Sequence, residues 1–199
     1  MDLLLLCRAE SESLAGRCVE GGQGSPLTAA GRRQADLLGA RLARSYRLAG
    51  LYASPLEEAW ETAAHVGSQI GLSPAQVDDL RELDPGELAG RARAGPLGPP
   101  RPGDIFAPFP GGESYVEMHV RAVNAINRLV EEAAGQTIAV VTHPGPIQAY
   151  LLAFLRYAIE QRAELCLCCD PASLHHLRRR EDGRKELVRL NDTGHLLGL

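Results

Sequence analysis

The chain has 199 residues, of which 45% are hydrophobic and 23% are charged, a composition that suits one globular domain. Its formal net charge of −4 leaves no broad basic surface, which excludes nucleic acid and anionic membranes as expected partners. Five cysteines at irregular spacing favour free thiols in the cytoplasm over a disulfide framework. The run of four leucines near the start is too short to span a membrane and lacks the basic leader of a signal peptide.

The first half of the chain predicts two strands, each followed by a helix. The strands are short apolar runs, and the helices have apolar residues at helical spacing. For the second helix, Ser54 is expected as the N-cap, Pro55 as the first helical residue and Glu57 as the capping-box partner. The expected elements, in order, are a strand at 3–7, a Gly- and Ser-rich loop at 11–26, a helix from about 28 to 46, a strand at 48–54 and a helix that ends at Gly71.

A long Pro- and Gly-rich excursion at 89–112 opens the second half. A loop of this length is usually functional or disordered, and Phe106 and Phe109 indicate a flap that either covers a pocket or is anchored to the core. The elements expected after the flap are a helix starting at Glu113 with a stripe of Val116, Val120, Val123, Ile126 and Val130, a central strand at 137–143, a helix with Pro144 at its first position, and antiparallel outer strands at 173–179 and 185–190.

This alternation of strands and helices predicts a three-layer α/β/α sandwich with a mostly parallel sheet, formed by a single domain over residues 1–199. Ligands of such sheets bind at the carboxyl ends of the strands. Cys7, Arg8 and His143 all fall at predicted strand ends, which indicates a pocket there.

Six segments of the chain resemble the histidine phosphatase superfamily, also called phosphoglycerate-mutase-like, in the family's order and at about its spacing. The resemblance implies the sandwich fold of that family and a phosphate pocket, and we expect no cofactor. The segments are SPLTAAGRRQADLLGARL (25–42), YASPLEEAWETA (52–63), LRELDPGELAG (80–90), GGES (111–114), VVTHPG (140–145) and LNDTGHL (190–196).

The resemblance also implies a set of catalytic positions. The family has a histidine after the first strand that attacks phosphorus, arginines that hold the phosphate oxygens, a glutamate that serves as acid and base, and a second histidine that contacts the phosphate. In this chain Glu82 matches the glutamate and His143 matches the second histidine. Both residues are therefore expected in the pocket.

The remaining family positions are occupied by different residues. Arg8 falls where the family has its nucleophile, Cys7 where it has an arginine, and Glu58 where it has a second phosphate-binding arginine. A guanidinium has no lone pair to offer, so Arg8 cannot attack phosphorus, although it can bind an anion. The first histidine of the sequence is His65, within a predicted helix. No nucleophile of the family's kind therefore follows the first strand.

Two other chemistries fit the sequence less well. A cysteine phosphatase needs a phosphate-cradling loop between its Cys and Arg, but Cys7 and Arg8 are adjacent. The CLCC segment at 166–169, even with His175 and His176, has no common zinc-site spacing, and an alternating apolar strand accounts for it better. We expect no metal.

The sequence therefore predicts a degenerate family member that has kept the phosphate-site fold but lost the phospho-histidine chemistry. It would bind a small phosphorylated or other anionic ligand, or regulate a protein partner. Two alternatives stay open, namely an active phosphomonoesterase or other hydrolase with a rearranged site built on His143 and Glu82, and an oligomeric scaffold with a vestigial pocket. The residues assigned to the ligand are Cys7, Arg8, Arg17 and Glu58.

Overall fold

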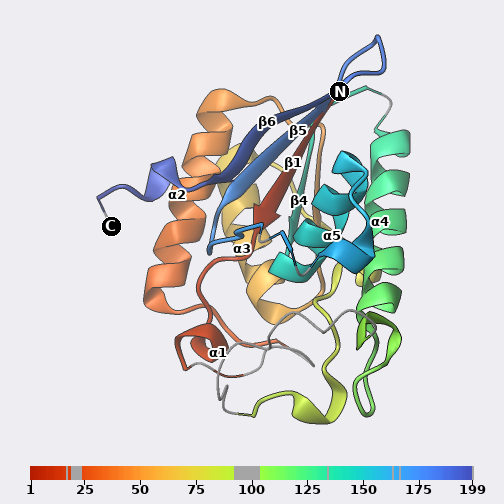
Figure 1. Cartoon of the computed structure of the whole chain (residues 1–199). Coiled ribbons are helices and arrows are strands. Elements are labelled where there is room, and N and C mark those ends of the chain that lie inside the picture. The colour runs from red at the N-terminus through yellow and green to blue at the C-terminus, as the bar shows by residue number, and fades with distance from the viewer. Residues whose placement is uncertain are drawn as a thin grey trace.

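The described residues form a six-stranded sheet with the order β3-β2-β4-β1-β5-β6 (Figure 1). This computed structural model describes residues 1–16, 18, 24–91, 104–133, 135–162, 164–165 and 167–198. β3, β2, β4 and β1 are parallel, whereas β5 and β6 are antiparallel to their neighbours, so the predicted mostly parallel sheet with antiparallel outer strands is confirmed. The strands are β1 (Asp2–Cys7), β2 (Gly50–Ala53), β3 (Ala75–Gln76), β4 (Ile138–Thr142), β5 (Leu174–Arg179) and β6 (Lys185–Asp192).

Helices cover both faces of this sheet, which confirms the three-layer sandwich. α2 (Ala29–Ser45) and α3 (Glu57–Ile70) lie on one face, and α4 (Tyr115–Glu132) and α5 (Pro144–Leu155) lie on the other (Figure 1). The shorter segments are helix α1 (Glu12–Ala15) and the 3-10 turns η1 (Asp78–Leu80), η2 (Gly86–Leu88), η3 (Asp104–Phe106), η4 (Ile159–Gln161) and η5 (Gly194–Leu196).

The leucine run of β1 supplies both cores of the sandwich. Leu3 and Leu5 pack with α4 and α5, whereas Leu4 and Leu6 pack with α2 and α3, and all four are at most 4% exposed. Side chains of a strand point alternately to the two faces, so a strand covered on both sides is apolar at every position. β1 is therefore held firmly at the centre of the sheet, and the residues that follow it are fixed in place.

The start of α3 differs from the prediction. Its N-cap is Leu56, without a side-chain capping bond, so the capping box assigned to Ser54 and Glu57 is wrong. Ser54 instead extends the end of β2, where its backbone N donates to Val141 O at 3.0 Å. The helix ends at Gly71 as predicted, in the left-handed conformation (φ 71°) that glycine adopts without strain.

The start and the buried face of α4 also differ from the prediction. The helix begins at Tyr115 rather than Glu113, because Ser114 and Glu117 form a capping box there. Val120, assigned to the buried stripe, is 51% exposed, whereas Ile126 and Val130 are buried as predicted. The buried face is displaced around the helix, toward Met118, Ala122, Ala125 and Leu129.

Residues 92–103 of the predicted flap lie outside the described residues. In the part that follows them, Ile105 is buried and the ring of Phe109 lies 5.8 Å from that of Tyr115, centroid to centroid. Phe106 is 61% exposed. Phe109 therefore anchors this segment to the start of α4, which favours the core-anchoring alternative for that residue.

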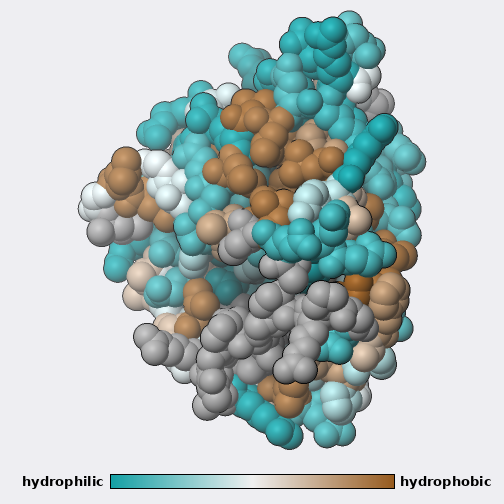
Figure 2. Space-filling model, in the orientation of Figure 1, coloured by the Kyte–Doolittle hydropathy of each residue, from teal (hydrophilic) through white to brown (hydrophobic). Residues whose placement is uncertain are grey.

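The sheet ends at β6, an edge strand with an apolar side. Leu187, Val188 and Leu190 are 39–40% exposed, and apolar atoms gather over this part of the sheet in Figure 2. The pairing of β6 with β5 is interrupted by register shifts, which bend an edge strand and disfavour pairing with a further strand. Among the described helices, none has the length and apolar character needed to cross a bilayer.

Candidate functional site

The carboxyl ends of β1, β2 and β4 meet at one edge of the sheet and bring Arg8, Ser54 and His143 together. Backbone hydrogen bonds join these ends, from Arg8 N to Thr142 O at 2.8 Å and from Ser54 N to Val141 O at 3.0 Å. Arg8 is 2% exposed, and Ser54 and His143 are fully buried. The strand ends therefore form the candidate site that the sequence predicted, but with their side chains enclosed.

His143, the N-cap residue of α5, has both ring nitrogens directed at polar groups. Its Nε2 lies 2.8 Å from Ser54 Oγ, and its Nδ1 lies 3.5 Å from Glu58 Oε1. Burial, reinforced by the positive charges of Arg8 and Arg121, lowers the pKa of His143 well below its usual range. The contact between His143 and Glu58 therefore involves a neutral imidazole. It is not an ion pair, although the distance between the two groups would allow an ion pair.

The neighbours of this neutral ring favour one tautomer. A carboxylate only accepts hydrogen bonds, so the Nδ1 proton is best directed at Glu58, which leaves Nε2 to accept the Ser54 hydroxyl proton. In this arrangement the lone pair of His143 Nε2 is occupied. The order serine, histidine, carboxylate is that of serine hydrolases, but all three groups are buried, at most 1% exposed.

Glu58 is buried in the first turn of α3, where it is 1% exposed. Its Oε2 accepts a hydrogen bond from Ser25 N at 2.8 Å. Gly24 passes so close that a Cβ there would lie 2.3 Å from Glu58 Oε2, and its φ of +85° also requires glycine. The carboxylate is therefore packed between the backbone at 24–25 and His143.

Glu82, from the loop after β3 and η1, lies at the N-terminus of α5. Its carboxylate accepts Leu83 N at 2.8 Å and Gly145 N at 3.1 Å. A helix N-terminus presents unpaired N–H groups and a partial positive charge, so it stabilises this carboxylate. Glu82 and His143 thus approach the same helix end.

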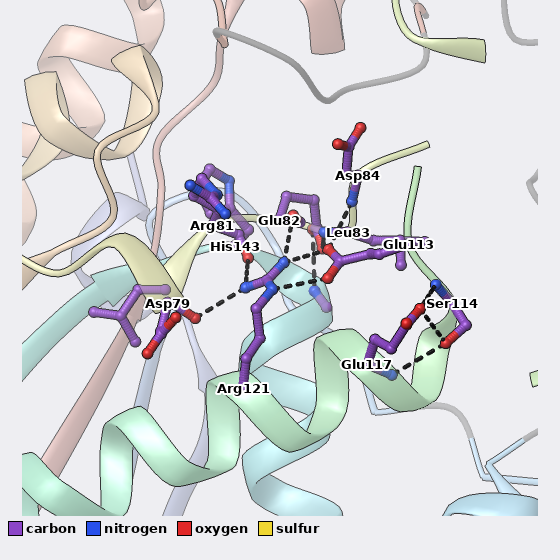
Figure 3. A network of polar contacts seen from close by, with 12 residues as sticks. Asp79, Arg81, Glu82, Leu83, Asp84, Glu113, Ser114, Glu117, Arg121 and His143 are labelled. Carbon is purple, nitrogen blue, oxygen red and sulfur yellow. Dashed lines mark hydrogen bonds and ion pairs between the residues drawn. The ribbon is translucent and has the colours of Figure 1, made fainter. Parts of the chain in front are cut away.

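Arg121 of α4 fixes the loop that carries Glu82 (Figure 3). Its guanidinium donates to the carbonyls of Asp79 at 2.9 Å, Arg81 at 2.7 Å and Glu82 at 2.9 Å, and to both carboxylate oxygens of Glu113. Glu113 in turn accepts Asp84 N at 2.9 Å. One arginine therefore holds residues 79–84 against the start of α4 and positions Glu82.

The other residues assigned to the ligand differ in their placement. The Nη1 of Arg8 donates to Ala9 O at 3.3 Å, and Arg8 lies near enough to His143 to affect its pKa. Cys7 is fully buried in the core beside α5, and its thiol donates to Cys169 O at 3.6 Å. Arg17 lies outside the described residues. The ligand role of these residues stays a prediction.

Ser54 and Arg121 belong to the site but were not assigned to it from the sequence. Ser54 is the last residue of the predicted strand at 48–54, so the strand-end rule that identified Arg8 and His143 could have found it. Arg121 gives no local signal, because its carbonyl partners lie in a loop far away in the sequence. No cluster of three metal-binding side chains occurs among the described residues.

Several known proteins are similar to this chain over nearly its whole length. Bifunctional protein Rv2228c of Mycobacterium tuberculosis is 31% identical over 202 residues, which cover 97% of this chain and 54% of that protein, so the chain spans about half its length. Phosphoserine phosphatase 1 of Hydrogenobacter thermophilus is 29% identical, with 98% and 93% covered. The structure of Bacillus stearothermophilus YhfR matches with a TM-score of 0.86 at 26% identity, with 98% of each chain covered. The model of the histidine phosphatase superfamily (branch 1) matches residues 3–193, and the chain belongs to this superfamily.

Proposed function

We propose that this protein is a degenerate histidine phosphatase that binds a small phosphorylated or other anionic ligand without forming a phosphohistidine. The observation that carries the proposal is Arg8 at the end of β1, buried beside His143. Arginine cannot attack phosphorus, but it binds phosphate oxygens as a fork. His143 is a poor substitute nucleophile because its Nε2 is engaged by Ser54 at 2.8 Å.

The position of Glu58 supports the inference that this protein has lost phosphoryl transfer. Its carboxylate lies 3.5 Å from His143 Nδ1, so a phosphoryl group beside His143 would meet a negative charge at the position where the resemblance implies an arginine. Two like charges about 5 Å apart repel by roughly 3 kcal/mol at an effective dielectric of 20, and a phosphate dianion approximately doubles this. Pairing of Glu58 with Arg8 would leave the site self-neutralised, with phosphate affinity in the millimolar range or weaker, about −4 kcal/mol.

An active phosphomonoesterase is the second candidate. Its support is that the Hydrogenobacter relative is named a phosphoserine phosphatase and that Glu82 and His143 stand at the family's acid–base and second-histidine positions. In that enzyme Glu82 would donate a proton to the leaving oxygen, and Ser54 would have to release His143 Nε2. A regulatory role through a protein partner is compatible with the first candidate.

The two candidates are separated by turnover and binding measured on the same protein. We expect no hydrolysis of an aryl phosphate above that of buffer, and weak phosphate binding by calorimetry. Glu58→Gln should tighten phosphate binding, because it removes a buried negative charge, whereas Glu57→Gln, at the exposed neighbouring position, should leave it unchanged. Turnover that is lost in His143→Ala would establish the second candidate instead. Unchanged or weaker phosphate binding in Glu58→Gln would refute the electrostatic argument.

A further inference from the structure

A small cavity lies at the end of the molecule opposite to the candidate site. Its walls include Leu3 near the start of β1, whereas Arg8 of the candidate site follows the end of that strand. The cavity measures about 10 Å³, which is room for one water molecule or a group of similar size, such as a methyl. A buried water needs several polar partners, so a mostly apolar cavity suits a methyl group better. The lining includes Met1, Leu3, Val130, Tyr150, Phe154 and Leu177.

Three positively charged side chains, Arg156, Arg179 and Lys185, lie beside this cavity. Arg179 belongs to its lining. Lys185 Nζ donates to Phe154 O at 3.0 Å and lies 5.0 Å from the centre of the Phe154 ring, which also lines the cavity. Burial lowers the pKa of Lys185, and the positive charges of Arg179 and Arg156 lower it further. The three cations are therefore close enough to repel one another.

The other cations of this region are paired with carboxylates. Arg178 and Arg180 form ion pairs with Glu186 at 3.5 and 2.8 Å. Arg184, in the turn between β5 and β6, contacts Asp182 at 3.5 Å. By contrast, none of the three cations beside the cavity has an ion-pair partner among the described residues. The unpaired positive charge of this end of the molecule is thus concentrated around the cavity.

The contacts that these three cations do make are with neutral groups. Arg179 Nη2 donates to Asn127 Oδ1 at 3.4 Å and to the Tyr150 hydroxyl at 3.5 Å, both longer than an ordinary N–H···O bond. Arg156 ends α5 in the left-handed conformation (φ 58°), where glycine is the usual residue. The C-terminus of that helix offers roughly half a negative charge, which compensates only a small part of three positive charges. The rim of the cavity therefore attracts an anionic partner.

Exposed apolar surface adjoins the cavity on the side of β6. Leu187 is 39% exposed and pairs with Leu177 of the cavity wall, so both side chains lie on one face of the sheet. Figure 2 shows apolar atoms over this part of the sheet. Protein interfaces combine an apolar centre with a polar rim whose charges complement those of the partner. We propose that Leu187, the cavity and its three cations form a docking surface for a partner protein, which binds through an acidic segment with an aliphatic side chain in the cavity.

The surroundings of this docking surface favour a peptide over a lipid bilayer. Glu181 and Asp182 are exposed in the neighbouring turn between β5 and β6, beside the N-terminus in Figure 1, and an anionic bilayer would repel them. A peptide can place its carboxylates only where the cations are, and one of its side chains fits a cavity of methyl size. The inference is independent of the proposed function, because the docking surface and the candidate site lie at opposite ends of β1.

Fluorescence polarisation with three labelled peptides tests the docking surface. The first combines leucine with glutamate (fluorescein-EELEELEE-amide), the second has glutamine for each glutamate, and the third has serine for each leucine. The first should bind at least about tenfold more tightly than either of the others, and added salt should weaken its binding. Lys185→Gln and Arg179→Gln should each reduce this affinity by about threefold, and together by about tenfold. Arg184→Gln, at a side chain 81% exposed in the turn, is the matched control.

Val130→Ile provides a second, independent variant, because its added methyl group fills the cavity. It should remove the preference for leucine over serine but keep the preference for glutamate over glutamine. This variant decides the matter if circular dichroism shows that the cation variants fail to fold.

Three outcomes would overturn the docking surface and leave the proposed function standing. The first is equal binding of the three peptides, or no binding of the first peptide. The second is binding to phosphatidylserine vesicles that Lys185→Gln abolishes, without peptide binding, which would assign the surface to a membrane. The third is a dimer in sedimentation velocity that Lys185→Gln dissociates, which would assign it to a second copy of this chain.

Discussion

The carboxylate of Glu82 and the backbone of Gly145 are in such close contact that no side chain fits between them. Gly145 N donates to Glu82 Oε2 at 3.1 Å, and a Cβ on Gly145 would lie 2.0 Å from Oε1. Gly145 stands in the first turn of α5, where alanine would otherwise favour the helix by about 0.5–1 kcal/mol. Glycine is therefore needed at position 145 to leave room for the Glu82 carboxylate, and not for the helix conformation.

We predict that Gly145→Ala destabilises the protein by about 1–3 kcal/mol, because the new methyl group displaces the Glu82 carboxylate. Urea denaturation measures the loss. Glu82→Ala should relieve most of it, so the double variant should show a coupling of at least about 1 kcal/mol. A neutral or stabilising Gly145→Ala would mean that Glu82 does not occupy the end of α5.

The Arg121 network should be a principal stabiliser of the 79–84 loop. Arg121→Met removes the donor of three carbonyls and leaves the Glu113 carboxylate with Asp84 N but without its ion-pair partner. The side chains of Arg121 and Glu113 are only 16% and 19% exposed, so a loss of about 2–4 kcal/mol in the free energy of unfolding is expected. Arg128→Met, on the same helix, breaks an ion pair with Asp79 between side chains 57% and 42% exposed and should cost less than about 1 kcal/mol. Chemical denaturation of both variants makes the comparison, and similar losses would contradict it.

His175 should make the protein sensitive to mild acid. Burial lowers its pKa from 6.5 to about 4, against an opposing effect of Asp170, and Asn191 N donates to its Nδ1 at 3.3 Å. Between these two pH values the unfolded state binds the proton more readily, so stability is lost as the pH falls from 6.5 toward 4, by at most roughly 3 kcal/mol.

The test compares His175→Gln with the parent protein by urea denaturation at pH 7, 6, 5 and 4. The variant should lose less stability across this range than the parent does. Part of the slope should remain, because the pKa of His143 is also lowered by burial. A variant whose stability follows the parent's pH dependence throughout would show that His175 is protonated in the folded protein.

Restoring the family's residues should restore its chemistry. In the triple variant Cys7→Arg, Arg8→His and Glu58→Arg, with Glu82 and His143 unchanged, a nucleophile and phosphate-binding forks meet the acid in one site. We expect phosphomonoesterase activity at least roughly a hundredfold above the parent, or about 2.7 kcal/mol of barrier. Arg8→His alone and Glu58→Arg alone should each gain little, since binding without attack does not lower the chemical barrier.

Cys7→Arg is the substitution that most endangers the folding of this variant, because position 7 is fully buried and an arginine must fit beside α5. Circular dichroism and thermal unfolding therefore accompany the assay. A folded triple variant without activity would show that the family positions are misassigned at the first strand. A parent protein that already hydrolyses the aryl phosphate and loses this activity on substitution would make Arg8 part of a working site.

Strands with a clear local pattern, such as an unbroken apolar run, could be predicted from the sequence. β1 and β4 were predicted because every residue of an apolar run is buried when a strand is covered on both faces. Those strands located Arg8 and His143. Ser54 was misassigned as a helix cap because its side-chain partner, His143, follows another strand and is distant in the sequence. The buried face of α4 was predicted at the wrong position around the helix, because Val120 fits an apolar stripe but is exposed in the structure.

The chemistry of the site depends on contacts that no local pattern contains. From the sequence, Glu58 could either stabilise the first turn of its helix through the helix dipole or face a pocket. Only the packing of residues 24–25 and His143 around its carboxylate distinguishes these two roles.

The position of β1 between β4 and β5 has a consequence for how the chain folds. Leu3 pairs with Ile138 on one side and with Leu177 on the other, so β1 has no neighbour until β4 is available and only one until β5 is available. Contacts between such distant residues slow folding and leave apolar segments exposed meanwhile. The apolar residues of β1 thus stay uncovered until β4 pairs with them, and the core between the sheet and helices α2 and α3 closes only when β4 and β5 are in place.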